Sequence, residues 1–262
     1  MTESRLSLPR TYTRKMLRAI REFELIRPGD RVLVGFSGGK DSSFLLYALA
    51  IFQKHRIIPF ELGALTVDLG FKNPFDYQAL QHYCQSLQVP FSLLNTEIAK
   101  YALGEDNPEG HCATCSFLRR GAMNRFAKKN GYNLIALAHH HDDAVETFLM
   151  SILFSGQIKT FLPRTELQRT GLTVIRPLVY FRESEIRKAI RLTHFEPQPS
   201  PCPMAGHTKR AETKELIRRL CRNDKAVFQH LAAAIREGRP RELWPAELSR
   251  AEKRRRNLFP EQ

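Results

Sequence analysis

The chain has 262 residues, of which 42% are hydrophobic, so it can bury at least one sizeable core. No apolar run reaches the ~18 residues of a membrane span, and the first residues form no apolar signal block, so we expect a cytoplasmic protein with no membrane partner. Its 41 Lys and Arg outnumber 27 Asp and Glu, and this net charge of +14 favours a polyanionic partner, although many basic proteins bind none.

The predicted elements alternate between helix and strand over the first two thirds of the chain. An amphipathic helix over 12–25 ends before Pro28, and five short apolar runs of buried-strand type follow. The predicted strands cover 31–36, 62–67, 89–94, 134–138 and 173–175. The helices between them cover 43–52, 75–87, 117–130 and 144–154. This alternation predicts an α/β fold with a doubly wound, parallel, five-stranded sheet.

No strand pattern recurs beyond residue 181. Helices are predicted over 184–192, 208–221 and 225–235, and the last segment is rich in Pro and charge. We therefore divide the chain into a basic N-terminal helix (1–28), an α/β nucleotide-binding domain (29–181) and a helical, basic C-terminal region (182–262) that contributes Cys202. The nucleotide-binding role of the middle part depends on the loop described next.

A glycine pair lies between the first predicted strand and its helix, in the run Ser37-Gly38-Gly39-Lys40-Asp41-Ser42. Glycines let backbone N–H groups approach a phosphate, and the helix N-terminus adds a partial positive charge. A Walker A loop is excluded, because Val34 stands where it needs glycine and Asp41 where it needs Ser or Thr. The glycine spacing also excludes a dinucleotide fingerprint. The run therefore predicts a different kind of phosphate site.

Three of the five cysteines form a candidate metal site. Cys112 and Cys115 make a CxxC pair just before a predicted helix, and Cys202 lies between two prolines in a rigid, non-helical segment. Three thiolates can hold three irons of a [4Fe–4S] cluster, whereas zinc prefers a fourth ligand, such as His111 or His207. The spacing alone leaves iron–sulfur, zinc and redox chemistry open. The other cysteines lie in helical patterns and are interpreted as core residues: Cys84 and Cys221.

Taken together, the loop, the CxxC pair and the distant third cysteine resemble the tRNA 2-thiocytidine synthetase-like family of PP-loop tRNA thiolases. The PP-loop itself reads S-G-G-x-D-S. The run 115–121 resembles the segment after the family's CxxC, and 138–147 resembles its G-H-H-x-D-D-x-x-E-T block, with Ala138 in place of glycine. The run 175–178, followed by Arg182-Glu183, also matches. The zinc-ribbon cysteines of the thiouridine relatives are missing, which favours cytidine over uridine.

This resemblance implies ATP-dependent 2-thiolation of a pyrimidine in tRNA. The base 2-oxygen would be adenylated by cleavage of ATP between its α and β phosphates, and sulfur would then be transferred to carbon 2. It also implies Mg²⁺ and a [4Fe–4S] cluster held by Cys112, Cys115 and Cys202. A sulfur donor, either a cysteine desulfurase or sulfide, an electron donor and a homodimer are compatible with this function.

Catalytic roles are assigned to Lys40, Arg119 and Asp143. Lys40 would stabilise pyrophosphate, Arg119 the adenylated intermediate, and Asp143 would hold Mg²⁺ or position the base oxygen. Asp143 also suits the first turn of a helix, and Arg119 could simply be solvated. The expected nucleotide-binding residues are Ser37, Gly38, Gly39, Asp41 and Ser42 of the loop and, by analogy with such sheets, Val34, Leu65, Val67 and Ala138.

Two further groups of residues are weaker candidates. The adjacent histidines His139, His140 and His141 cannot easily share one ion, because neighbouring side chains point in different directions, so we predict structural or nucleotide-lining roles. Basic residues near both ends of the chain are candidates for a tRNA phosphate surface: Arg14, Arg18, Arg218, Arg219, Arg222 and the run 253–256.

Two other functions stay open. One is tRNA lysidine synthesis, a PP-loop reaction that activates the same carbonyl for attack by lysine and needs no metal cysteines. The other is a non-catalytic, metal- or redox-sensing nucleotide-binding protein.

Overall fold

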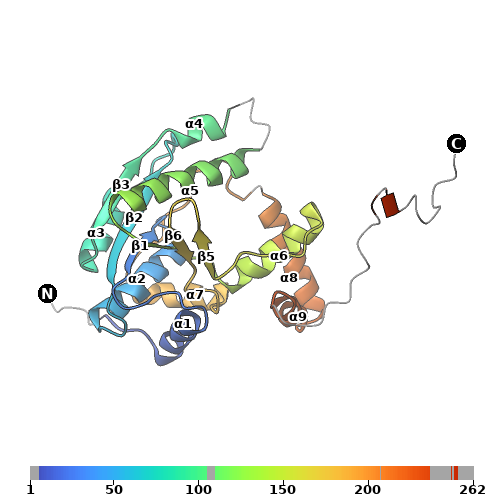
Figure 1. Cartoon of the computed structure of the whole chain (residues 1–262), viewed down its shortest axis with the longest axis horizontal. Coiled ribbons are helices and arrows are strands. Elements are labelled where there is room, and N and C mark those ends of the chain that lie inside the picture. Colours follow the sequence, from blue (N-terminus) through green and yellow to red (C-terminus); the bar gives the residue numbers. More distant parts are fainter. Residues whose placement is uncertain (1–5, 105–109, 207, 237–248, 250, 253–262) are drawn as a thin grey trace.

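Helices cover both faces of a central sheet in the computed structural model, which describes residues 6–104, 110–206, 208–236, 249, 251 and 252 (Figure 1). The strands are β1 (Arg31–Gly35), β2 (Glu61–Asp68), β3 (Phe91–Asn95), β4 (Leu134–Ala136), β5 (Arg164–Leu167) and β6 (Leu172–Ile175). The helices are α1 (Arg10–Glu22), α2 (Lys40–Lys54), α3 (Tyr77–Ser86), α4 (Ile98–Ala102), α5 (His111–Lys129), α6 (His141–Ser155), α7 (Glu183–Ala189), α8 (Lys209–Asn223) and α9 (Val227–Ala234), with a 3-10 turn, η1 (Ile190–Thr193).

The strand order of the sheet is β3-β2-β1-β4-β6-β5. The chain runs outward from β1 to β3 and then crosses to β4 on the other side of β1. The strand order therefore reverses between β1 and β4. In doubly wound sheets, ligands bind beyond the carboxyl ends of the strands at such a reversal. The glycine loop follows β1, and the histidine and aspartate run 139–143 follows β4, so both reach this point.

The predicted α/β class and double winding are confirmed, but the five-stranded, wholly parallel sheet is wrong on one point. A sixth strand, β5, pairs antiparallel with β6 at the edge of the sheet. Its sequence is Arg-Thr-Glu-Leu, and it is only partly buried. A short, polar edge strand has one neighbour and needs no apolar run, so the buried-strand pattern misses it. The short helix α4 is also absent from the predicted elements.

Side chains alternate along each strand, so successive residues face opposite sides of the sheet. Different helices pack against the two sides. Val32 and Val34 of β1 lie on the face covered by α1 and α2, whereas Leu33 lies on the opposite face with Met123 of α5. α2 is buried on nearly all sides, from Ser42 to Phe52. This packing holds the loop at the start of α2 in a fixed position.

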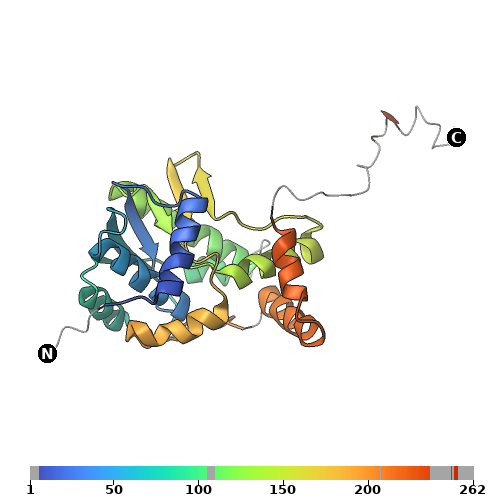
Figure 2. The ribbon, with the colours of Figure 1, turned by 90° about the horizontal axis from the view of Figure 1, so that it is seen from below.

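α6, α8 and α9 form a smaller cluster beside the sheet, with α8 and α9 packed against α6 (Figures 1 and 2). Its buried residues are Val145 of α6, Ile217 of α8 and Phe228 of α9. The predicted boundary at 181/182 falls at the start of α7, which packs with α2 in the main core. No helix in the described part of the chain is long and apolar enough to span a bilayer. The basic run 253–256 lies outside the described residues.

Candidate active site

A cavity of about 1100 Å³ opens at the carboxyl ends of β1 and β2 and beyond β4. Its walls come from the glycine loop, α5, the start of α6, the β5–β6 hairpin and the segment around Cys202. The candidate phosphate site and the candidate metal site therefore share one chamber, although their residues are widely separated in the chain.

The glycine loop is held in shape by its own hydrogen bonds. The hydroxyl groups of Ser37 and Ser42 lie 3.0 Å apart, and that of Ser42 donates to the carbonyl of Gly39 at 3.0 Å. Gly38 has φ +75°, and a Cβ there would lie 3.0 Å from the ring of Phe75, so only glycine fits. Gly39 is the N-cap of α2 and offers no side-chain acceptor to the first turn, which leaves helix N–H groups available to an anion.

Lys40 begins α2 but is not among the residues that line the cavity. Its ammonium lies 2.8 Å from Asp41 and 3.3 Å from Glu183. Burial lowers the pKa of Lys40, but these two carboxylates outweigh burial and raise it above its ordinary value. The lysine is therefore fully charged, and its pairs lie at the edge of the phosphate loop.

A chain of ion pairs continues from Glu183 to the start of α6. Glu183 lies 2.7 Å from Lys214, which is 4.0 Å from Glu146. Glu146 lies 3.2 Å from Arg210, which is 3.5 Å from Asp143. These contacts attach α8 to the phosphate loop and to α6. No sequence motif indicated Lys214 or Arg210. The match at Arg182-Glu183 could have indicated Glu183.

Asp143 has both of the roles considered for it from the sequence. One carboxylate oxygen accepts from the N–H of His140 at 2.9 Å in a capping box of α6, and the residue also lines the cavity. Its neighbour Asp142 is absent from the cavity lining and instead accepts from the guanidinium of Arg182 at 3.0–3.2 Å and from the N–H of Glu183 at 2.8 Å. The two adjacent carboxylates therefore serve different parts of the structure.

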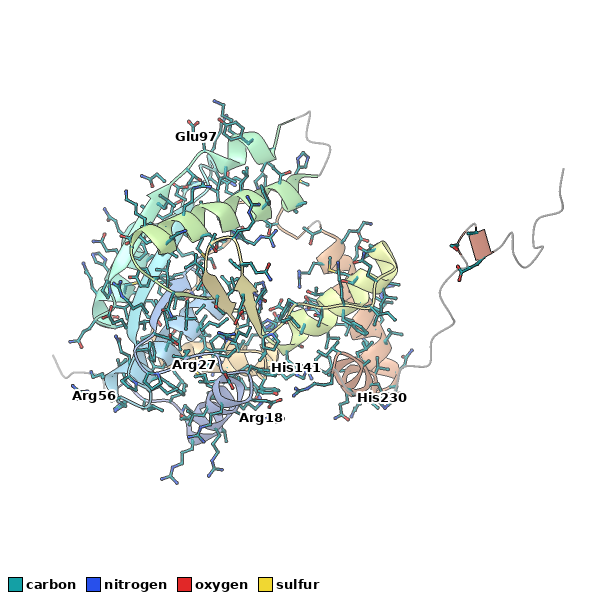
Figure 3. All side chains as sticks on the ribbon, viewed as in Figure 1. Arg18, Arg27, Arg56, Glu97, His141 and His230 are labelled. Carbon is teal, nitrogen blue, oxygen red and sulfur yellow. The ribbon has the colours of Figure 1, made fainter. Side chains whose placement is uncertain are left out.

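The three histidines point to three different places. His139 lies against the ring of Phe161 and lines the cavity, and His140 lies 3.8 Å from Asp41. His141, at the start of α6 (Figure 3), packs edge-on against Phe228 of α9. Burial lowers the pKa of His139 to about 4, so its imidazole is neutral at pH 7. Its buried Nδ1 has no hydrogen-bond partner among the described residues.

The CxxC pair lies inside α5, whose start at His111 comes six residues before the predicted position. Residues three apart share a helix face, so Cys112 and Cys115 both line the cavity. Cys202 reaches the same cavity on a segment whose Pro201 carbonyl accepts from Asn73 at 2.8 Å. Burial raises the pKa of the Cys115 thiol, Arg119 lowers it, and the thiols of Cys202 and Cys112 raise it further. All three thiols are free, and all three line the same cavity.

The chemistry of this donor set fits a cluster better than a zinc ion. In the described part of the chain, no three His, Cys, Asp or Glu side chains are arranged to hold one ion. His111 is bonded through Nδ1 to the carbonyl of Ala102 at 2.8 Å, and His207 lies outside the described residues. Thiolates on one zinc lie within roughly 4 Å of each other, whereas a cluster binds each thiolate through its own iron. Three thiols line this chamber, and three is the number of thiolates that holds a [4Fe–4S] cluster with one iron open.

Three of the four apolar residues predicted near the nucleotide line the cavity: Leu65, Val67 and Ala138. Val34 is a correction, because it is fully buried on the opposite face of the sheet, against α2. The residue of β1 that does line the cavity is Gly35, which is paired in register with Leu65. The period of two along a strand could have identified this residue.

The run S-G-G-x-D-S between β1 and α2, at the strand-order reversal of a doubly wound sheet, is typical of PP-loop nucleotide-binding proteins. The family model described as PP-loop domain matches residues 9–196. The chain is 36% identical over 236 residues to the tRNA-cytidine(32) 2-sulfurtransferase of Geobacter sulfurreducens. These residues cover 89% of this chain and 91% of that protein. It is 33% identical over 251 residues to the enzyme of the same name from Dichelobacter nodosus, and this match covers 95% of this chain and 93% of that protein. The chain belongs to the tRNA-cytidine(32) 2-sulfurtransferase family of PP-loop proteins.

A solved structure shares the fold. The U34-tRNA thiolase of Methanococcus maripaludis, solved with its [4Fe-4S] cluster, aligns with a TM-score of 0.70 and 20% identity, covering 86% of this chain and 77% of that one. The family resemblance inferred from the loop and cysteines is confirmed by the family model and by the relatives.

Proposed function

We propose that this chain is an ATP-dependent tRNA sulfurtransferase that replaces the 2-oxygen of a cytidine with sulfur. The observation that carries the proposal is the shared cavity, which is lined by the phosphate loop and by Cys112, Cys115 and Cys202. A base entering this chamber meets both the group that activates its oxygen and the group that supplies sulfur. The printed names of the relatives support cytidine as the target.

The two-step chemistry explains why both sites are needed. The 2-oxo group is a poor leaving group. Attack of this oxygen on the α-phosphorus of ATP forms an O–P bond and releases pyrophosphate. A sulfide-level nucleophile then adds to carbon 2, and AMP departs with the oxygen. The loop N–H groups and the start of α2 stabilise the charge that gathers on the phosphates.

Three side chains take roles in this scheme. Lys40, charged beside the loop, stabilises pyrophosphate as it forms. Asp143, on the cavity wall, holds Mg²⁺ or positions the base oxygen. Arg119, four residues after Cys115 on α5, also lines the cavity and neutralises the adenylated base. All three would act from fixed elements: Lys40 and Asp143 from the starts of α2 and α6, and Arg119 from the middle of α5.

The thiols of Cys112, Cys115 and Cys202 would hold a [4Fe–4S] cluster with one iron open, and the chemistry it supplies is delivery of the sulfur atom. A cysteine desulfurase or sulfide would provide that sulfur, and an electron donor would keep the cluster reduced. The two cysteines outside the cavity have no part: Cys84 is fully buried in the core, and Cys221 packs with Val145 and Ile217.

Basic residues on α1 and α8 would contact tRNA phosphates. Arg18 lies on α1 at the edge of the molecule, where it pairs with Glu22 at 3.2 Å (Figure 3). Three arginines of α8 lie within 3.4–3.6 Å of the single carboxylate of Glu215: Arg218, Arg219 and Arg222. One carboxylate cannot neutralise three guanidinium groups, so this end of α8 keeps an excess of positive charge.

The test uses anaerobically purified protein, unmodified tRNA, ATP and sulfide. We expect an iron–sulfur absorbance, pyrophosphate release that requires tRNA, and 2-thiocytidine by mass spectrometry of the nucleosides. Cys202→Ala should lose absorbance and thiolation, whereas Cys221→Ala should keep both.

Three outcomes would contradict the proposal. A colourless protein with stoichiometric zinc would remove the cluster from the mechanism. Lysine incorporation that survives in Cys112→Ala would indicate lysidine synthesis. ATP binding without pyrophosphate release on any tRNA would indicate a non-catalytic nucleotide-binding protein.

A further inference from the structure

An exposed phenylalanine lies on the wall of the cavity. Phe117 of α5 is 66% exposed and lines the same chamber as the phosphate loop and the thiols. The residue one turn later is Gly121, where a Cβ would meet only the guanidinium of Arg125, at 3.4 Å. The flank of the ring is therefore open. A large aromatic side chain left uncovered at a concave site is a platform on which a planar group can stack.

Two arginines without a carboxylate partner line the same cavity as this ring. Arg120, three residues after Phe117, lies on the same side of α5 and also lines the cavity. Arg176, just after β6, lines the cavity as well; its guanidinium donates to the carbonyl of Leu162 at 2.6 Å and lies over the ring of Phe161. No carboxylate of the described residues pairs with either. The only described carboxylates that line the cavity are already engaged, Asp41 with Lys40 and Asp143 with Arg210.

An open aromatic face on a cavity wall that also carries two arginines without a carboxylate partner has the chemistry that recognises a single-stranded nucleotide. Bases of single-stranded RNA stack on aromatic side chains, and their phosphates pair with arginine. We infer that Phe117 and Arg120, in the cavity that Arg176 also lines, form a subsite for an unstacked tRNA nucleotide, the base lying on Phe117 and its phosphate on Arg120. This inference rests on the proposed function, since it names how the tRNA substrate is held at that site.

The chain offers a matched control for each contact. Tyr101 of α4 is 65% exposed and lies on the helix that packs beside α5, but it does not line the cavity (Figure 1). Arg56, which follows α2, is an exposed arginine that also lies outside the cavity lining (Figure 3). Tyr101→Ala and Arg56→Gln therefore remove the same kinds of group from positions outside the cavity.

The experiment measures binding of full-length tRNA to the cluster-loaded protein by fluorescence anisotropy over a range of salt concentrations. Phe117→Ala and Phe117→Leu should weaken binding roughly 5- to 150-fold, as expected for loss of one stacked base, with an unchanged salt slope. Phe117→Tyr should bind like the wild type. Arg120→Gln should reduce the salt slope by about one. The two control variants should match the wild type.

Several results would overturn the subsite. Wild-type affinity in Phe117→Leu would show that the ring face is not used. Equal losses in Phe117→Ala and Tyr101→Ala would show a general surface effect. A raised KM for ATP in Arg120→Gln would assign that arginine to the ATP site, and a loss of absorbance would assign it to the cluster.

Failure of the proposed function is recognised separately. If the wild type binds tRNA but forms no thionucleoside, that function is wrong and the binding series still tests the subsite. If the wild type thiolates tRNA and the Phe117 variants keep its KM for tRNA, the subsite is wrong and the function stands.

Discussion

The ammonium group of Lys40 lies 3.3 Å from a carboxylate oxygen of Glu183, which joins the first residue of α2 to the first residue of α7. The Glu183 side chain is only 13% exposed, and its other oxygen lies 2.7 Å from Lys214 of α8. Burial alone would raise the pKa of Glu183, but Lys214, Arg187 and Lys40 lower it well below the ordinary range. One carboxylate therefore ties the phosphate loop to two helices of the C-terminal part.

Glu183→Gln should destabilise the protein by about 2–3 kcal/mol, because it leaves two partly buried lysines without this charge partner. The measurement is the midpoint of urea denaturation. Glu215→Gln is the control, since Glu215 pairs with arginines on the surface of α8 and its loss should change stability by less than about 1 kcal/mol. Equal shifts in the two variants would contradict a special role for Glu183.

Substitution of the adjacent residues Asp143 and Asp142 should distinguish a catalytic carboxylate from one that only stabilises the fold. Asp143→Asn should lower kcat about 100-fold or more, since a charge on the cavity wall is lost, and should cost about 1 kcal/mol of stability through the capping box. The measurements are thiolation kinetics and thermal unfolding.

Asp142→Asn is the matched control for that substitution. It removes the carboxylate that pairs with Arg182, so it should reduce stability as much or more while the folded fraction keeps its kcat. Loss of kcat in both variants at equal folded fraction would remove the distinction.

The two glycines of the loop should respond differently to alanine. Gly38→Ala places a Cβ in a left-handed backbone and against Phe75, so we expect a loss of about 1–2 kcal/mol and poor use of ATP. Gly39 has φ −80° and a Cβ there would lie 3.5 Å from Ser37 Oγ, an ordinary contact. The free energy of unfolding of Gly39→Ala should therefore lie within about 0.5 kcal/mol of the wild-type value. Urea denaturation of both variants, with the KM for ATP, checks this pair.

The neutral, buried imidazole of His139 should make stability fall in acid. Its pKa is about 4 when folded and 6.5 ordinarily, so between these values the unfolded chain binds a proton that the folded chain does not. Stability should therefore fall as the pH drops from about 6.5 to about 4, by up to about 1.4 kcal/mol per pH unit from this residue. Urea midpoints of His139→Gln across this range should show a shallower slope, whereas His82→Gln, an exposed control, should follow the wild type.

Local sequence patterns were sufficient to predict most of the helices and the phosphate loop. The run from Ser37 to Ser42 carries its own turn and helix start, and α2 is apolar enough to be recognised as buried. Patterns failed where partners elsewhere in the fold stabilise an element. β5 is a polar edge strand that exists because β6 lies beside it, and α5 begins six residues early, after Gly110 in a positive-φ conformation.

The phosphate loop and the three cysteines can be recognised in the amino-acid sequence, because each motif is local. Their meeting in one cavity is not visible there, since Cys202 reaches the CxxC pair only through the packing of the chain around the sheet. The same holds for the buried strand residues Val34 and Leu65, which lie on opposite faces of the sheet, and for the pairing of Lys40 with Glu183. Side-chain spacing follows from backbone geometry within an element, whereas contacts between elements depend on how whole faces pack together.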